Sequence, residues 1–308
     1  MKKIKLARFL LSLLRLIPPR YKLKNKPGMH PEPFFVFGTG RNGSTLLNLM
    51  LNQHTQLFLP SEQYFLGNSI IKYQLYNYIL WRDLVKIIYA ELIKETGSHS
   101  WNFSPEKIIN DAFHFEGNQR TMEHLIHHIY LGYAQQTKPD VKFWGDTTPF
   151  NTRYLNEIYQ CLPQARYIFL VRDGRDVVAA YKKGSPEVFG HLTEPLEAVA
   201  HWIASIKKHD IIRQKTNVHV VKYEDMVQNP EETLRSITSF LSLDYQPQML
   251  RFHEHVPNLV EYNRTHHKNL HSPIQTSSVG QWKTILSDAE QKLIMPLVEP
   301  YLKKFNYL

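Results

Sequence analysis

A glycine-rich turn at residues 38–45, Gly-Thr-Gly-Arg-Asn-Gly-Ser-Thr, has residue types and spacing that could bind an anion. An apolar run at residues 34–37 precedes the turn, and a helical pattern follows it. Backbone N–H groups in such a turn point at one spot, and the helix N-terminus adds partial positive charge there. The turn therefore predicts a phosphate-binding site. The alternative is a glycine loop that only turns the chain.

The residue at the usual lysine position of this phosphate-binding spacing is Ser44. A kinase or an ATPase uses that lysine on the β- and γ-phosphates and needs Mg²⁺ to neutralise the transferred group. Here the basic side chain is Arg41, inside the turn. This arrangement favours transfer of a less highly charged group without a metal ion. A small-molecule kinase is the first alternative.

Strand and helix patterns alternate along the chain around this turn. Short apolar runs predict buried strands at residues 34–37, 167–171 and 218–221. Helical patterns occupy residues 45–53, much of 63–137, and further segments: 151–162, the stretch after Asp173, 194–214, 230–241 and 287–305. Ser287 and Glu290 have the spacing of a capping box for the last helix. The alternation predicts an α/β fold with a P-loop-like parallel sheet flanked by helices on both faces.

Three polar side chains follow the predicted strands closely: Arg41, Arg172 and Tyr223. Ligands of doubly wound sheets bind at the carboxyl ends of the strands, so we expect these side chains to converge there. Arg172 could hold a phosphate through two hydrogen bonds. The alternative for Arg172 is a surface ion pair with Asp173 or Asp176.

Four segments in order, residues 37–47, 167–180, 221–225 and 277–283, make the chain resemble one enzyme family. It resembles the sulfotransferases that use 3′-phosphoadenosine 5′-phosphosulfate (PAPS), and in particular their bacterial and tyrosylprotein branch. The resemblance implies a nucleotide site built from the turn, the strand ends and residues 277–283, which we call the late loop. Its residues would be Arg41, Asn42, Gly43, Ser44, Thr45, Arg172, Lys183, Tyr223, Ser277, Ser278 and Lys283.

The implied reaction is metal-independent, in-line transfer of the sulfuryl group from PAPS to a hydroxyl acceptor, with Arg41 taking part in catalysis. The acceptor would be a carbohydrate, a phenol or tyrosine, or a lipid, and residues 63–137 would form its helical site. A non-catalytic protein that binds the desulfated nucleotide (PAP) is the second alternative. For Trp282, nucleotide contact and a core or lid role are both open.

Two positions depart from the family pattern. Ala180 stands where the family usually has a serine for the 3′-phosphate, so Lys182 or Lys183 would supply the charge. Thr147 stands where a lysine is usual in the bacterial branch, and Lys142 or Lys283 would replace it. These departures leave open a weaker or an inactive member of the family.

Glu62 is the predicted general base. An acceptor hydroxyl has to lose its proton as it attacks, and a carboxylate can accept that proton. Glu62 lies 17 residues after Thr45 (62 − 45), an interval that the tyrosylprotein branch has for its glutamate. The alternative is an acid in the first turn of the next helix, with Ser61 as its N-cap.

The net charge of +9 does not come from the body of the chain. Residues 1–26 hold nine of the 37 basic residues and none of the 28 acidic ones. Residues 27–308 therefore hold 28 basic and 28 acidic residues. This balance argues against a nucleic-acid partner. Residues 4–17 have a helical, amphipathic pattern that is too short to span a bilayer. The alternatives are a helix on a membrane surface and a helix packed on the protein.

We therefore expect a basic amphipathic arm and linker at residues 1–30 and a sulfotransferase domain at residues 31–308. The single cysteine, Cys161, gives no internal disulfide, and no cleavage site of a signal peptide follows the arm. A cytoplasmic location with peripheral membrane contact is expected. Sixteen histidines invite a metal site, but neither the pair His124 and His128 nor the cluster at 266–271 has a suitable partner, so no metal is expected.

Overall fold

The structure, a computed structural model, describes residues 6, 9, 18–96, 105–139, 141–257 and 270–308. Contacts divide the chain into two compact units. Unit 1 comprises Met1–Pro33, Thr55–Asp146 and Tyr154–Ala165, and unit 2 comprises Phe34–His54, Thr147–Arg153 and Arg166–Leu308. Apart from residues 6 and 9, the predicted helix at residues 4–17 lies outside the described residues. The predicted division at residue 30 stays a prediction.

Unit 2 is built on three parallel strands: β1 (Phe34–Phe37), β4 (Arg166–Val171) and β5 (Val218–Lys222). β4 lies between the other two, with Phe34 opposite Arg166 on one side and Tyr167 opposite Val218 on the other. All of β1 and almost all of β4 are buried, which explains their unbroken apolar sequences. The three strands predicted from these runs are confirmed.

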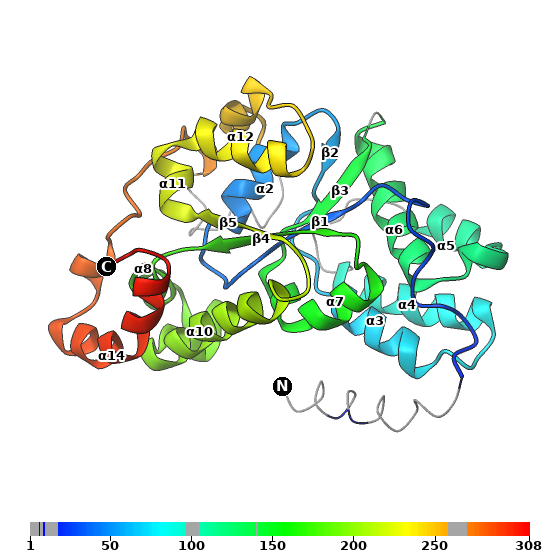
Figure 1. Cartoon of the computed structure of the whole chain (residues 1–308), viewed down its shortest axis with the longest axis horizontal. Coiled ribbons are helices and arrows are strands. Elements are labelled where there is room, and N and C mark those ends of the chain that lie inside the picture. Colours follow the sequence, from blue (N-terminus) through cyan, green and yellow to red (C-terminus); the bar gives the residue numbers. More distant parts are fainter. Residues whose placement is uncertain (1–5, 7–8, 10–17, 97–104, 140, 258–269) are drawn as a thin grey trace. The chain divides into compact units, whose positions relative to one another are not determined.

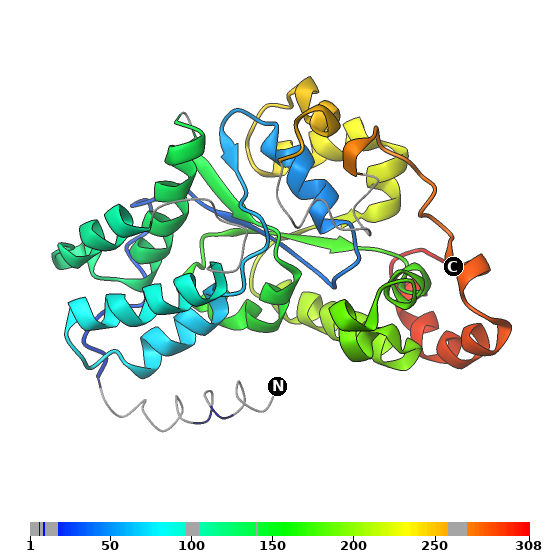
Figure 2. The same cartoon turned by 180° about the vertical axis from the view of Figure 1, so that it is seen from behind.

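Helices cover both faces of this sheet, as predicted (Figure 1). One side carries α2, α11 and α12, and the other carries α8, α10 and α14; Figure 2 shows the same arrangement from behind. The α/β fold class is thereby confirmed. The bounds are Ser44–Asn52 for α2, Gly174–Lys182 for α8, Pro195–Ile212 for α10, Tyr223–Gln228 for α11, Pro230–Phe240 for α12 and Asp288–Lys304 for α14. Shorter elements are α9 (Pro186–Phe189), η3 (Gly190–Thr193), η4 (Pro247–His255) and α13 (Trp282–Ile285).

The predicted capping box of the last helix is present. The Ser287 side chain accepts a hydrogen bond from the Glu290 backbone, and the Glu290 carboxylate accepts one from the Ser287 backbone. The single helix predicted at residues 151–162 is wrong in its first part. A 3₁₀ turn, η2 (Pro149–Tyr154), precedes α7 (Leu155–Cys161). Its Thr152 hydroxyl binds both the N–H and the C=O of Gly38, at 3.0 and 2.7 Å, so this turn ties down the end of β1.

Unit 1 is mostly helical, as predicted for residues 63–137. Its helices are α3 (Leu66–Leu75), α4 (Trp81–Thr96), α5 (Glu106–Phe113), α6 (Met122–Thr137) and α7, with the 3₁₀ turn η1 (Gly117–Gln119). Two short parallel strands that the sequence analysis missed, β2 (Leu57–Phe58) and β3 (Phe143–Asp146), also belong to this unit. Trp144 of β3 stacks on Tyr130 of α6 with 4.0 Å between the ring centroids, which anchors β3 to the helical core.

Within the described part of the chain, every helix is too short or too polar to cross a bilayer.

Candidate functional site

The turn between β1 and α2 has the backbone of an anion-binding loop. Arg41 and Gly43 have positive φ angles of 64° and 96°, so the chain passes through left-handed conformations there. A non-glycine residue in this region is uncommon and is often found at functional sites. The N-cap of α2 is Gly43, and the first turn of α2 contains no acidic residue. Its positive end is therefore not opposed by an acidic side chain of its own.

Two side chains fix this turn to the rest of unit 2. The Asn42 amide donates to the carbonyl of Leu170 in β4 at 2.8 Å, and its oxygen accepts from the Ser44 N–H at 3.2 Å. A Cβ atom on Gly43 would come within 2.4 Å of the Tyr223 ring. Glycine is therefore required at position 43 by the close approach of that ring as well as by its backbone angle.

Arg172 follows β4 directly. It joins the glycine-rich turn at residues 38–45, which we call the phosphate turn, to the late loop. Its Nη1 donates to the carbonyl of Arg41 at 3.0 Å, and its Nη2 donates to the carbonyl of Ser278 at 2.5 Å. The guanidinium lies 4.5 Å from the centroid of the Tyr223 ring, in cation–π geometry. Only 6% of Arg172 is exposed, so it is not the surface residue of the alternative interpretation.

The Nε of Arg172 is buried and has no hydrogen-bond partner. Leaving a buried donor of a charged group unsatisfied costs free energy, so such a group calls for a specific explanation. An anionic ligand is one such partner. The Oγ1 of Thr39, in the phosphate turn, is also buried without a partner.

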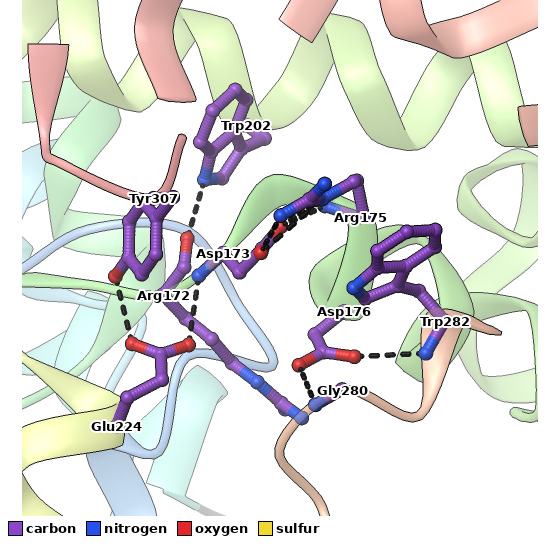
Figure 3. A network of polar contacts seen from close by, with 9 residues as sticks. All are labelled: Arg172, Asp173, Arg175, Asp176, Trp202, Glu224, Gly280, Trp282 and Tyr307. Carbon is purple, nitrogen blue, oxygen red and sulfur yellow. Dashed lines mark hydrogen bonds and ion pairs between the residues drawn. The ribbon is translucent and has the colours of Figure 1, made fainter. Parts of the chain in front are cut away.

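Asp176, in the first turn of α8, holds the late loop (Figure 3). Its two carboxylate oxygens accept from the backbone N–H groups of Gly280 at 2.7 Å and Trp282 at 2.9 Å. Burial raises the pKa of Asp176, and these hydrogen bonds and the Arg172 charge oppose that shift. The loop is fixed at a second point, because the Tyr223 hydroxyl and the Ser278 hydroxyl lie 2.5 Å apart.

A second carboxylate, Asp173, organises the start of α8. Its side chain accepts from the Arg175 backbone N–H at 2.8 Å and pairs with the Arg175 guanidinium at 3.0 and 2.6 Å. That guanidinium in turn lies 4.2 Å from the Trp282 ring centroid. Figure 3 shows Arg175 between Asp173 and Trp282. One face of Trp282 is therefore occupied by a cation that is itself held in place.

The backbone N–H of Asp173 donates to Glu224 at 3.0 Å, and the Tyr307 hydroxyl donates to the other Glu224 oxygen at 2.7 Å. Burial raises the pKa of Glu224, and the two hydrogen bonds lower it. The sequence analysis assigned no role to Glu224 or Tyr307 and considered Asp173 and Asp176 only as ion-pair partners of Arg172. An aspartate between a buried strand and a helix is a recognisable N-cap, so Asp173 could have been identified.

The structure also locates the predicted substitutes for missing side chains. Lys182 is paired with Glu290 at 2.6 Å, and the Lys183 amine lies 3.5 Å from the Gln281 amide oxygen, beside the late loop. Thr147 is buried, and its hydroxyl accepts a hydrogen bond from the Asn48 amide at 2.9 Å. Ser277 is the first residue of the late loop, and Lys283 is its last.

Glu62 belongs to unit 1 and follows β2. Its carboxylate accepts from the Tyr64 hydroxyl at 2.8 Å. The next helix, α3, begins only at Leu66, has Phe65 as its N-cap, and carries no acid in its first turn. The alternative with Ser61 as an N-cap and Glu62 as a first-turn acid is therefore wrong, whereas the role of Glu62 as a base stays a prediction.

The histidines of α6 form contacts within unit 1. His124 Nδ1 lies 2.8 Å from His30 Nε2, His30 stacks on His127, and His128 Nε2 lies 3.0 Å from the carbonyl of Ile108. No set of three potential metal ligands gathers in the described part of the chain. His266 and His267 lie outside that part.

We predict that removing the Asp176 carboxylate frees the late loop. In Asp176→Ala the backbone amides of Gly280 and Trp282 lose a charged hydrogen-bond acceptor, and such a bond contributes about 1.5–3 kcal/mol. These two amides should therefore exchange with solvent at least about tenfold faster. Asp176→Asn should give a smaller increase because it keeps one acceptor. Hydrogen exchange of the late loop checks this prediction, and Asp244→Asn, which changes an exposed carboxylate, is the control. Unchanged protection in Asp176→Ala would contradict the role of this residue.

We also predict that acid destabilises unit 1 through its histidine cluster. Burial, and then the neighbouring histidines, lower the pKa of His124 from 6.5 to about 4. Below pH 6.5 the unfolded chain therefore binds more protons than the folded chain. The contribution of His124 to the free energy of unfolding is complete above pH 6.5 and is lost as the pH falls towards 4. His124→Gln should flatten this part of the stability–pH curve. Denaturant unfolding at several pH values checks this, and an equally steep curve in the variant would count against it.

Comparison with known proteins places this site in a family. Residues 33–247, more than half of the chain, match the sulfotransferase family. A putative protein-tyrosine sulfotransferase of Caenorhabditis briggsae is 27% identical over 166 residues, which cover 52% of this chain and 58% of that protein. The alignment thus spans less than two thirds of that relative's length. Protein-tyrosine sulfotransferase A of Caenorhabditis elegans is 22% identical over 290 residues, 90% of this chain and 67% of that protein.

A solved structure shows the same fold. The sulfotransferase domain of the olefin synthase from Synechococcus PCC 7002 superposes with a TM-score of 0.59 at 22% identity, over 91% of this chain and 98% of that one. The family match includes the phosphate turn, which has Ser44 at the P-loop lysine position and Arg41 as its basic residue. The chain belongs to the sulfotransferase family.

Proposed function

We propose that this protein transfers the sulfuryl group of PAPS to a hydroxyl acceptor without a metal ion. The observation that carries the proposal is the buried Arg172 guanidinium, which has an unsatisfied Nε and lies between the phosphate turn and the late loop. A cation in this position fits a ligand with phosphate groups. The missing P-loop lysine argues against a kinase as the alternative.

The residues present fit a nucleotide with two separate anionic groups. Arg41, the Asn42–Thr45 backbone and the start of α2 would hold the 5′-phosphosulfate. Arg172 and Lys183 would hold the 3′-phosphate, with Tyr223, Ser277, Ser278 and Lys283 around it. The Arg172 hydrogen bond to the Arg41 carbonyl couples the two groups of residues, so one ligand could span both.

PAPS, when bound, supplies a sulfuryl group that is activated by its anhydride bond to phosphate. Arg41 and the N–H groups of α2 would stabilise the charge that develops on the departing 5′-phosphate. Glu62 would accept the proton of the acceptor hydroxyl as the new oxygen–sulfur bond forms and the sulfur–oxygen bond to the phosphate breaks. The products are a sulfate ester, PAP and a proton held by Glu62.

The acceptor we favour is the hydroxyl of a tyrosine or another phenol, because the relatives in Caenorhabditis are named as protein-tyrosine sulfotransferases. A carbohydrate and a lipid are the other acceptors that the aromatic-rich residues 63–137 would suit. We further propose a cytoplasmic location with peripheral membrane contact through residues 1–26, which carry nine basic and no acidic residues.

Nucleotide binding tests the class of the protein. PAP and PAPS should raise the melting temperature, whereas ATP with Mg²⁺ should not, because only a ligand that binds the folded state stabilises it. Arg172→Gln should weaken PAP binding by at least about tenfold, since a hydrogen bond to a charged group contributes about 1.5–3 kcal/mol. Arg213→Gln, an exposed arginine at the end of α10, is the matched control. Stabilisation by ATP with Mg²⁺ alone would refute the proposal.

The assignment of the base predicts a separate result. Glu62→Gln should lower kcat by about 10²–10⁴-fold, the usual contribution of a general base, and should leave the affinity for PAP unchanged. Tyr64→Phe removes the hydroxyl that donates to Glu62 but keeps the carboxylate, so it should retain most of the turnover. Near-normal turnover of Glu62→Gln with intact PAP binding would show that another group accepts the proton.

A further inference from the structure

Residues 20–26 of unit 1 form an irregular segment that bends at residues 20, 21, 23 and 24. The even-numbered residues Arg20, Lys22, Lys24 and Lys26 are all exposed, whereas the three residues between them are partly buried. Figure 1 draws the segment in dark blue beside α4 and α6. We call these four exposed cations the basic stripe.

Backbone hydrogen bonds hold the basic stripe in this conformation. The Tyr73 hydroxyl donates to the Lys22 carbonyl at 3.0 Å, and the Glu123 backbone N–H donates to the Leu23 carbonyl at 3.0 Å. Lys22 also forms a parallel β-bridge with Thr121. The inward side chains pack as well, because the Tyr21 ring lies 5.2 Å from that of Trp81. The spacing of the four charges is thus set by the fold of unit 1.

One acid, Glu123 of α6, contacts the segment. Burial raises the pKa of its carboxylate, which accepts a hydrogen bond from the Asn25 backbone N–H and interacts electrostatically with Lys24. Residues 1–26 themselves contain no acid. Four exposed cations held on one short segment suit a surface with repeated negative charges.

An apolar tip lies beside the start of the basic stripe. The Asn77 side chain forms two hydrogen bonds with the Tyr21 backbone. Its oxygen accepts from the N–H and its amide donates to the carbonyl, each at 2.7 Å. The loop around Asn77 exposes three large side chains: Tyr76 (39%), Tyr78 (58%) and Leu80 (59%). Asn77 itself is buried, so it fixes the apolar tip to the segment that carries the cations.

We infer that the basic stripe and the apolar tip together form a docking surface for an anionic lipid bilayer. Basic side chains near an anionic membrane are attracted to its lipid headgroups, and tyrosine and leucine enter the interfacial region below them. The apolar tip distinguishes this partner from a soluble polyanion, which needs cations alone. Residues 4–17, just before the stripe, are also rich in leucine, isoleucine and basic residues.

This surface extends the proposed membrane contact of residues 1–26 into the folded part of unit 1. It does not depend on sulfuryl transfer, because none of its residues belongs to the proposed nucleotide site. Failure of vesicle binding would therefore leave the proposed reaction untouched, and failure of PAP binding would leave the docking surface untouched.

The test is partition of the full chain between buffer and vesicles of phosphatidylcholine with or without phosphatidylserine. The chain should bind only the vesicles with phosphatidylserine, and added salt should release it. The double variant Lys22→Gln/Lys24→Gln should bind about 25-fold more weakly, since each charge near the surface contributes about fivefold. Tyr78→Ser/Leu80→Ser should also weaken binding to these vesicles.

A matched control is Lys207→Gln/Lys292→Gln, which removes two exposed lysines of unit 2 and leaves the same net charge. It should bind vesicles within about twofold of the unchanged chain. PAP-induced stabilisation reports that each variant is folded. Equal losses in the stripe and control variants would show a general charge effect and overturn the inference. So would a stripe variant that loses heparin binding but not vesicle binding, because the partner would then be a soluble polyanion.

Discussion

The position of the Arg172 guanidinium is the constraint on which the candidate site depends. One nitrogen binds the phosphate turn at Arg41, a second binds the late loop at Ser278, and the flat face of the group lies on Tyr223. These contacts join four stretches of chain that are far apart in the sequence. A planar group with several fixed donors can make all of these contacts at once, whereas a lysine amine could not.

The carboxylates around Arg172 accept their hydrogen bonds from other groups, while the Arg172 charge acts on Asp176 and Glu224 only electrostatically. Asp173 pairs with Arg175, Asp176 accepts two backbone N–H groups of the late loop, and Glu224 accepts from the Asp173 backbone and from Tyr307. Arg172 itself donates to two carbonyls, which carry only partial negative charge. The same acids therefore shape the site through these hydrogen bonds, while the hydrogen bonds of the Arg172 guanidinium go to backbone carbonyls.

The sequence was most informative where strand pattern and chemistry coincided. Arg41, Arg172 and Tyr223 were predicted to converge because each follows a strand of a parallel sheet. The Arg172 side chain does contact the Arg41 carbonyl and the Tyr223 ring, whereas the Arg41 guanidinium lies 5.3 Å from the Phe189 ring. The pairing of Asp176 with Gly280 and Trp282 could not be predicted, since it joins residues about a hundred positions apart and depends on how the late loop folds back. β2 was missed because two residues give no periodicity, and β3 because its sequence, Phe-Trp-Gly-Asp, lacks the unbroken apolar run that identified β1.

The absence of lysine from the phosphate turn acquires a structural reason from these contacts. A lysine at position 44 would project from the start of α2, where the buried Ser44 now packs beside Asn42. Under the proposed function, the positive charge would be supplied instead by Arg41 within the turn and by Arg172, which follows the neighbouring strand. A transferring sulfuryl group carries less charge than a phosphoryl group, so cations distributed around its leaving phosphate can replace a lysine and a metal ion at the transferred group itself.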